Sequence, residues 1–353
     1  MKNRRSLGNW EKYLSLNVAA CILAGTALGR IAPWIPDALS KLEVHNVSIP
    51  IAICLFAMIY PIMVQISFSE VKSAARSLRP IGLTLLMNWA IKPFTMALFA
   101  WIFLRIIFLP YLGAQQAQQY TAGLILLGVA PCTAMVLVWS YLAGGNMAHT
   151  LVMTAINSLS MVILYAPLAT ILLGVSGIPV PWETIALAVV AYICTPLAAG
   201  WITRDRAIKM KGVEWFERNL VPRLGKMAIA ALLATLVILF SYQGDKILEL
   251  PATIGMITTG ILANILLVFG LSYLLAKALG LGYEDAAPTA IIAGSNHFEV
   301  SIAVATTLFG LNSGASLATV VGVLTEVPIM LSLVWLCKRT AGFFGPRPRS
   351  IRP

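Results

Sequence analysis

Ten apolar runs of about 20 residues each set the strongest constraint on what this chain can fold into. They are centred near residues 24, 57, 94, 131, 161, 192, 233, 265, 298 and 326. A helix needs roughly 20 apolar residues to cross the hydrocarbon core of a bilayer. Only 11% of the residues are charged, against about a quarter in soluble proteins. We therefore predict an all-α polytopic membrane protein with ten transmembrane helices in a lipid bilayer.

The basic residues lie almost entirely on one side of this predicted topology. With the N-terminus inside, twenty Lys and Arg residues fall in or beside cytoplasmic segments, and only Lys41 and Lys246 fall in the opposite loops. Cytoplasmic loops carry the excess of Lys and Arg, so both termini are predicted to be cytoplasmic. The net charge of +11 thus reflects topology and does not indicate nucleic-acid binding. No cleavage site follows the first apolar run, which predicts a retained helix and not a signal peptide.

The sequence also predicts the structure of two connecting segments and of the C-terminal tail. The neutral segment 109–120 is expected to be an outside loop, with the fourth helix starting near Thr121. Segment 203–218 is expected to form a short amphipathic helix at the membrane interface, with Val213, Trp215 and Phe216 on its apolar side. The Pro- and Arg-rich tail is expected to be disordered beyond about Phe344.

The chain also repeats itself weakly at an offset of 166 residues. The matched pairs are Gly128 with Gly294, Gly144 with Gly310, Asn146 with Asn312, and Leu151 with Leu317. This indicates two five-helix repeats, residues 1–178 and 179–340, followed by a cytoplasmic tail at 341–353. Because five is an odd number, the second repeat must run through the membrane inverted relative to the first.

Each repeat has one apolar run with helix-weakening residues at mid-length. In the first, Pro131 cannot donate to the preceding turn and disfavours helical geometry at Ala130. In the second, residues 294–297 read Gly-Ser-Asn-His at the corresponding depth. Transporters built from inverted repeats place their substrate site near the midplane, on paired discontinuous helices. We therefore expect helices 4 and 9 to be discontinuous and to cross near the midplane.

Three side chains at these depths could carry chemistry. Cys132 follows the helix breaker, which can expose its thiol to a cavity, although cysteine is also an ordinary small apolar residue in such helices. A charged carboxylate near the bilayer centre costs at least a few kcal/mol, so Glu299 and Glu326 are candidate proton carriers. The alternative for each glutamate is a structural hydrogen bond to Asn264, Lys92 or a helix terminus.

Four other polar residues allow two interpretations each. Lys92 could sit near an interface and extend to water, or pair with one of the two buried carboxylates. His297 could tune Glu299 or face a neighbouring helix. Asn157 and Ser158 could bond neighbouring helices or line the site, and we favour the first.

The cysteines and histidines are too scattered for a metal centre. The five Cys residues lie in or beside apolar runs without ligand-like spacing, and the three His residues are at positions 45, 149 and 297. The sequence therefore predicts no disulfide, no structural zinc and no cofactor.

Three segments carry a family resemblance. Residues 130–146 (APCTAMVLVWSYLAGGN), 295–310 (SNHFEVSIAVATTLFG) and 322–328 (GVLTEVP) resemble the signature segments of the arsenical-resistance arsenite efflux permeases. These form a branch of the bile acid/sodium symporter superfamily, and the resemblance covers essentially the whole chain. It implies a ten-helix inverted-repeat carrier in a prokaryotic cell (inner) membrane that expels As(OH)3, and in some members antimonite, in exchange for protons. It also implies that the family's essential cysteine and glutamate correspond to Cys132 and Glu299.

The chemistry of the residues agrees with that implication. Trivalent arsenic and antimony are soft centres that favour sulfur, so Cys132 is the expected ligand of the arsenic. Oxygen donors from Thr133, Ser295 and Asn296 would keep the binding weak enough for release. Because As(OH)3 is uncharged, membrane potential alone cannot expel it. Glu299 is expected to be part of the substrate site as well, so that substrate and proton compete for it in alternate access. Each proton exchanged through it adds roughly 2.3 kcal/mol per 100 mV.

Other functions fit the residues less well. A sodium-coupled organic-anion symporter of the same superfamily would use clustered Asn, Gln, Ser and Thr donors and would not need a cysteine. An intramembrane metalloprotease would need HExxH, which the sequence lacks, and a serine protease would need Gly-x-Ser with a membrane His partner. A passive channel for a neutral solute gains nothing from two titratable groups at mid-membrane. We therefore predict a transporter and not an enzyme.

Overall fold

The computed structural model describes residues 14–35, 42–44, 47–66, 78–133 and 135–345 of the chain. Apart from one two-stranded hairpin, these residues form helices and short connections. The hairpin pairs β1 (Glu43–Val44) with β2 (Val47–Ser48) in antiparallel register. The predicted all-helical, polytopic architecture is confirmed. The predicted disordered tail falls on residues 346–353, which lie outside the described residues.

The first half of the chain forms helices where the apolar runs predict them. Its helical elements are α2 (Leu14–Ile31), α4 (Ile49–Gln65), α6 (Leu78–Leu85), η1 (Leu86–Ile91), α7 (Lys92–Ile102), η2 (Phe103–Ile107), α8 (Leu109–Leu112), α9 (Ala114–Val129), α10 (Met135–Ala143) and α11 (Met147–Val175). Both η1 and η2 are π-helical turns, which shift the faces of the helix that follows. Pro93 favours such a turn at η1, because its ring nitrogen cannot bond the carbonyl one turn earlier.

The second half repeats this pattern of long and interrupted helices. Its elements are α12 (Trp182–Val189), η3 (Val190–Cys194), α13 (Thr195–Trp215), η4 (Phe216–Leu220), α14 (Val221–Glu249), α15 (Pro251–Ala278), α16 (Tyr283–Gly294), α17 (Phe298–Phe309), α18 (Gly314–Arg339) and the 3-10 turn η5 (Ala341–Phe344). In both halves the fourth apolar run is divided into two shorter helices, α9 and α10 in the first and α16 and α17 in the second.

Several helical stretches have the length and composition of membrane spans. Within the described residues, five are long and apolar enough to cross: Arg79–Ile107, Met147–Val175, Trp182–Gly244, Pro251–Ala278 and Gly314–Arg339. The third contains 63 residues, about 95 Å of helix and roughly three times the hydrocarbon thickness. Gly212 interrupts it with a φ of 81°, a left-handed conformation that glycine adopts without steric cost.

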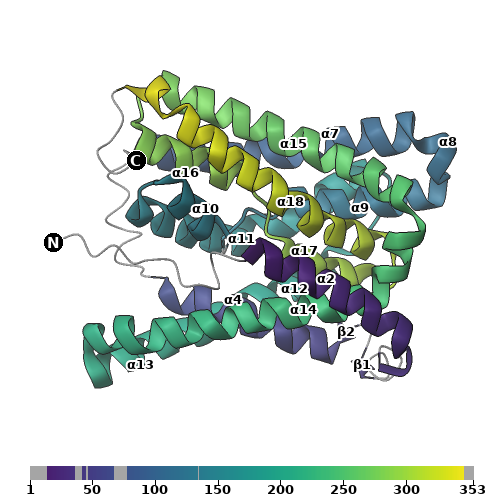
Figure 1. The fold of residues 1–353 in the computed structure, drawn as a ribbon, viewed down its shortest axis with the longest axis horizontal. Helices are drawn as coiled ribbons and strands as arrows, with labels where there is room; N and C mark the ends of the chain where they lie inside the picture. Colours follow the sequence, from purple (N-terminus) through teal and green to yellow (C-terminus); the bar gives the residue numbers. More distant parts are fainter. Residues whose placement is uncertain (1–13, 36–41, 45–46, 67–77, 134, 346–353) are drawn as a thin grey trace.

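The helices pack as two groups, and each half of the chain contributes to both. In the first group α14 packs against α2 and α4, and α13 packs against α4. In the second group α9 packs against α7 and α18, and α15 packs against α7 and α16. Figure 1 shows α4, α13 and α14 along one side of the molecule and α15, α16 and α18 along the other. The predicted repeat boundary at residue 178 therefore does not coincide with the division between these groups.

The expectation of a loop at residues 109–120 is wrong. The segment forms α8 and the start of α9, and only Gly113, with a φ of 74°, turns the chain between them. Its Ala and Gln residues are strong or moderate helix formers. Most of residues 111–116 are exposed, so their polarity marks an exposed helix end and not a loop.

The expectation of a separate interfacial helix at 203–218 is also wrong. Helix α13 runs through most of the segment, and the chain kinks at Gly212 before it continues into η4 and α14. Phe216 is buried beneath the guanidinium of Arg204, which lies 4.9 Å from the ring centre. Val213 is 53% exposed. The two residues therefore do not share one apolar side.

Candidate functional site

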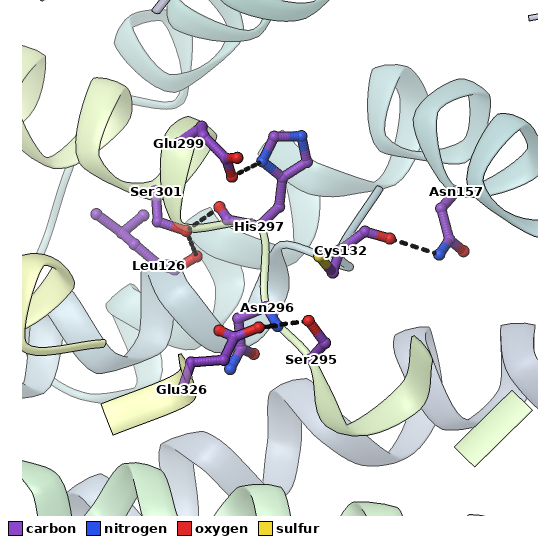
Figure 2. A network of polar contacts seen from close by, with 9 residues as sticks. All are labelled: Leu126, Cys132, Asn157, Ser295, Asn296, His297, Glu299, Ser301 and Glu326. Atoms are coloured by element: carbon purple, nitrogen blue, oxygen red, sulfur yellow. Dashed lines mark hydrogen bonds and ion pairs between the residues drawn. The ribbon is translucent and has the colours of Figure 1, made fainter. Parts of the chain in front are cut away.

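The two interrupted helices meet at their interruptions. Pro131 and Asn296 form an isolated antiparallel bridge, and the backbone N–H of His297 donates to the carbonyl of Ala130 over 2.9 Å. The bond of Ser301 Oγ to the carbonyl of Leu126, at 3.1 Å, adds a contact between α17 and α9. Figure 2 shows the polar side chains that surround this meeting point, which we call the crossover (residues 130–133 and 295–297).

The interruptions have different local causes. In the first, Pro131 supplies no N–H, and Ala130 takes an extended conformation as the C-cap of α9. Gly128 lets α9 approach α7 closely, because a Cβ at this position would lie 2.4 Å from the Cβ of Met96. In the second there is no proline, and Ser295 caps α16 in an extended conformation. Side chains from other helices hold this second interruption, as described below.

Cys132 lies inside the crossover and is 1% exposed. The side-chain amide of Asn157 donates to the Cys132 carbonyl over 3.2 Å, and Asn88 donates in turn to Asn157 over 3.1 Å. The Cys132 thiol lies beside the Ser295 hydroxyl and within Coulombic range of Glu299 and Glu326. The sulfur therefore faces polar groups inside the protein and not the surrounding lipid.

Asn157 thus contacts the crossover directly. We favoured a role for Asn157 and Ser158 in bonding neighbouring helices, and Asn157 does bond α11 to other elements. One of its partners, however, is the backbone of the predicted substrate ligand. Ser158 bonds within its own helix, to the carbonyl of Thr154 at 3.0 Å.

Glu299 and His297 form a buried acidic and imidazole pair. Nδ1 of His297 lies 2.8 Å from Oε2 of Glu299, and their side chains are 0% and 2% exposed. The two atoms are in close contact but are not aligned as a hydrogen bond. Glu299 lies in the first turn of α17, where the helix dipole favours a negative charge. Of the two interpretations of His297, contact with Glu299 is the one that the structure supports.

Glu326 holds the second interruption from α18. Its Oε1 accepts a hydrogen bond from the Ser295 hydroxyl and another from the Asn296 backbone N–H, at 3.1 Å for the latter. Both bonds end on residues 295–296, where the chain leaves α16. Glu326 therefore supports the irregular backbone, and its second oxygen, Oε2, has no hydrogen-bond partner among the described residues.

Lys92 reaches the same segment from the other side. Its side chain is 0% exposed, and Nζ donates to the Ser295 carbonyl over 2.7 Å. The interpretation in which Lys92 extends to water at an interface is therefore wrong, because α7 and its neighbours enclose the whole side chain. Glu326 bonds the same segment, so lysine and carboxylate meet at residues 295–296, but among the described residues no direct ion pair joins Lys92 to Glu299 or Glu326.

Several buried polar atoms at the crossover have no hydrogen-bond partner in the part of the chain that the structure describes. They are Thr133 Oγ1, Asn296 Nδ2, Asn296 Oδ1, His297 Nε2 and Glu326 Oε2. Buried polar groups in native proteins are normally paired with protein or water. A concentration of unpaired atoms around one thiol indicates a place that accepts a small polar solute.

The structure brings the predicted site residues together from three elements. Cys132 and Thr133 come from the first interruption, Ser295 and Asn296 from the second, and Glu299 from the start of α17. Glu326, the other predicted proton carrier, reaches them from α18. Sequence reasoning underrated Lys92 and Asn157. Both are polar residues within apolar runs, and this signal was available from the sequence.

The described residues contain no group of three or more His, Cys, Asp or Glu side chains placed to hold a metal ion. The site instead offers a single soft thiol among oxygen and nitrogen donors. Such a set suits a transient ligand better than a resident ion.

Comparison with known proteins places the chain in a family of transporters. Residues 52–250 match the profile of the "Sodium Bile acid symporter family". The chain is 51% identical over 352 residues to an uncharacterized transporter of Synechocystis sp., covering 97% of this chain and 92% of the relative. It is 43% identical over 340 residues to the arsenical-resistance protein Acr3 of Alkaliphilus metalliredigens, covering 96% and 95% of the two chains. It is 32% identical over 334 residues to the arsenical-resistance protein Acr3 of Corynebacterium glutamicum, covering 92% and 88%. The chain therefore belongs to the Acr3 arsenical-resistance family of membrane transporters, within the sodium bile acid symporter superfamily.

Proposed function

We propose that this protein exports trivalent arsenic, as arsenite, together with its heavier congener antimonite, from the cytoplasm in exchange for protons. The observation that carries the proposal is the enclosed thiol of Cys132, set among unpaired polar atoms and two carboxylates at the crossover. The name of two relatives, arsenical-resistance protein Acr3, supports the same substrate.

The substrate step follows from ligand exchange at arsenic. The sulfur of Cys132 forms a bond to the arsenic of As(OH)3, one As–O bond breaks, and the thiol proton leaves with that hydroxyl as water. A single sulfur ligand leaves the complex reversible, and Thr133, Ser295 and Asn296 offer hydrogen bonds to the remaining hydroxyls. Release reverses the exchange when water returns to the site.

The proton step is assigned to the carboxylates. Glu326 already accepts two hydrogen bonds that hold the backbone of the second interruption. Changing its protonation would disturb that backbone. Glu299 contacts the side chain of His297 and holds no backbone segment among the described residues, so its proton can be exchanged with less rearrangement. We therefore propose Glu299 as the main proton carrier and Glu326 as a second group coupled to it.

The proposed architecture is ten crossings arranged as two inverted repeats, residues 1–178 and 179–340, with 341–353 as a cytoplasmic tail. Both interruptions fall at matching positions under the 166-residue offset. Gly144 and Gly310, also matched at that offset, follow α10 and α17 with φ of 74° and 86°. The asymmetric Lys and Arg distribution supports cytoplasmic termini in a prokaryotic inner membrane. The discontinuous helices would then cross near the midplane.

The test is arsenite accumulation in everted membrane vesicles of an arsenite-sensitive host that expresses this chain. We expect accumulation when respiration establishes a proton gradient, and its loss when a protonophore collapses the gradient. The same host should gain resistance to arsenite. Accumulation that ignores the protonophore would contradict proton exchange and favour a passive channel.

The description of the superfamily favours one alternative, a sodium-coupled symporter for an organic anion. Right-side-out vesicles that accumulate a bile acid or keto acid on a sodium gradient would support this alternative. Export of arsenite from the same preparation would count against it. Because the substrates and gradients differ, the two functions give separate readouts.

A further inference from the structure

Lys92 is a lysine enclosed completely within a membrane protein, and its surroundings identify what it does there. Its ammonium donates to the Ser295 carbonyl over 2.7 Å, and the side chain has no exposed surface. Ionisable residues in membrane segments are costly, and they persist where they pair or serve transport. Neither Cys132 as the ligand of arsenic nor Glu299 as the proton carrier requires a lysine at this position.

The groups around the ammonium are those that suit a hard monovalent cation. Ser295 is the C-cap of α16, so its carbonyl lies at the negative end of a half-helix. The Glu326 carboxylate lies within Coulombic range of the ammonium and bonds the same segment. Half-helix C-termini and unwound carbonyls are the groups with which secondary transporters coordinate sodium.

Unlike a free ion, the ammonium of Lys92 cannot dissociate from its position beside Ser295, because the backbone that carries it is fixed. The side-chain amide of Asn264 on α15 donates to the Lys92 carbonyl at 3.3 Å and to Thr95 Oγ1 at 2.7 Å. The π-helical turn η1 and Pro93 set the direction in which the Lys92 side chain departs. Two helices thus fix the backbone from which the charge extends into the crossover.

We propose that the ammonium of Lys92 is a tethered counter-cation, filling the place beside Ser295 and Glu326 that a free sodium ion would otherwise take. Transport by this chain is then independent of sodium, although the superfamily is described by sodium symport. The inference rests on the proposed function only in its transport test, because cation binding to the purified protein is measured separately.

The first test measures melting temperature on the purified full-length protein, in sodium and in potassium at equal ionic strength. The unchanged protein should melt at the same temperature in both salts. Lys92→Gln removes the positive charge beside the Ser295 carbonyl and the Glu326 carboxylate. Sodium should therefore raise the melting temperature of this variant by about 2 °C or more over potassium. Direct binding of radioactive sodium should appear in this variant alone.

Three variants control this measurement. Lys92→Arg keeps the charge and should show no sodium effect. Lys209→Gln changes an exposed lysine that pairs with Asp205, and should also show none. Lys92→Gln combined with Glu326→Gln removes both charges, so the sodium effect should disappear.

The second test measures arsenite accumulation in everted vesicles with and without sodium. The unchanged protein should perform equally in both buffers. Without sodium, arsenite accumulation by Lys92→Gln should be about tenfold or more below that of the unchanged protein. Adding sodium should restore part of this accumulation. A sodium requirement in the unchanged protein would overturn the proposal, even if Lys92→Gln fails to fold. A folded Lys92→Gln that ignores sodium in both tests would also overturn it. Absence of arsenite transport by the unchanged protein would instead refute the proposed function and leave the melting test valid.

Discussion

The two interruptions that meet at the crossover are built from different chemistry. The first, at residues 130–133, contains one sulfur and no ionisable carboxylate, and its shape comes from Pro131 and from Asn157 on α11. The second, at residues 295–297, has no proline and is surrounded by charged groups, namely Lys92, Glu299 and Glu326. The first interruption has its own helix breaker and one supporting amide from α11, whereas the second has no proline and depends on Lys92 from α7 and Glu326 from α18.

This difference suggests a division of roles between two equivalent positions of the repeat. The first interruption offers a soft atom that suits the substrate, and the second offers charges that suit the coupling ion. Because main-chain hydrogen bonds join the two interruptions, a movement of one should displace the other. Substitutions on each side should therefore separate substrate binding from ion coupling, and the following predictions are ordered by expected effect.

The largest effect is expected from Cys132→Ser. A hydroxyl is a poorer ligand than a thiol for trivalent arsenic, so accumulation in energised everted vesicles should fall about a hundredfold, or ~2.7 kcal/mol. Cys194→Ser on η3 is the matched control and should leave accumulation unchanged, because this residue lies away from the crossover. Accumulation unaltered in Cys132→Ser would remove the substrate role from the first interruption.

Glu299→Gln should separate ion coupling from substrate binding. The amide cannot carry an exchangeable proton, so gradient-driven accumulation should fall about tenfold or more. Exchange of labelled for unlabelled arsenite at equal pH on both sides should continue, because Cys132 is intact. If both activities vanish together while the protein remains folded, Glu299 serves the substrate as well, and the division of roles fails.

Asn157→Ala tests whether the first interruption depends on outside support. The change leaves the Cys132 carbonyl without its amide donor, which should cost about 1–3 kcal/mol of stability. The melting temperature of the purified protein should fall by several degrees, at about 2–4 °C per kcal/mol. Thr170→Ala, on the same helix, removes a hydroxyl that bonds to the Ala166 carbonyl one turn earlier and should cost much less. Equal losses in the two variants would indicate that the interruption is fixed by Pro131 alone.

The smallest effect is expected from Tyr283→Phe. The Tyr283 hydroxyl donates to the Ala143 carbonyl over 2.7 Å and joins the start of α16 to the end of α10. Its loss should cost about 0.5–1.5 kcal/mol in thermal unfolding, with arsenite accumulation unchanged within about twofold. A large loss of transport would mean that contacts beyond the crossover keep the two interruptions aligned.

Much of this arrangement could be predicted from the sequence. Membrane-spanning helices must be long and apolar, so the spans and the polar residues within them are easy to recognise. Apolar runs located the helices, and Pro131 located the first interruption. The segment at residues 109–120 was misjudged because polarity alone cannot distinguish a loop from an exposed helix end. Segment 203–218 was misjudged because the kink at Gly212 changes which residues share a face.

The partners of the buried polar residues could not be predicted for a different reason. Lys92 and Ser295 lie 203 positions apart in the chain, and no local pattern links them. The π-helical turn before Lys92 also shifts the side chain away from the direction that ordinary helical spacing gives. Sequence could therefore name the polar residues, but the tertiary structure was needed to pair them.

The join between Ala130, Pro131, Asn296 and His297 consists of main-chain atoms. Glu326 and Lys92 support the second half of this join, and the Cys132 thiol takes no part in its main-chain bonds. A lineage can therefore replace the sulfur without removing the bonds that hold the two interruptions together. One fold can in this way serve carriers with different substrates and coupling ions. Their specificities would differ in a few side chains around the same backbone contact.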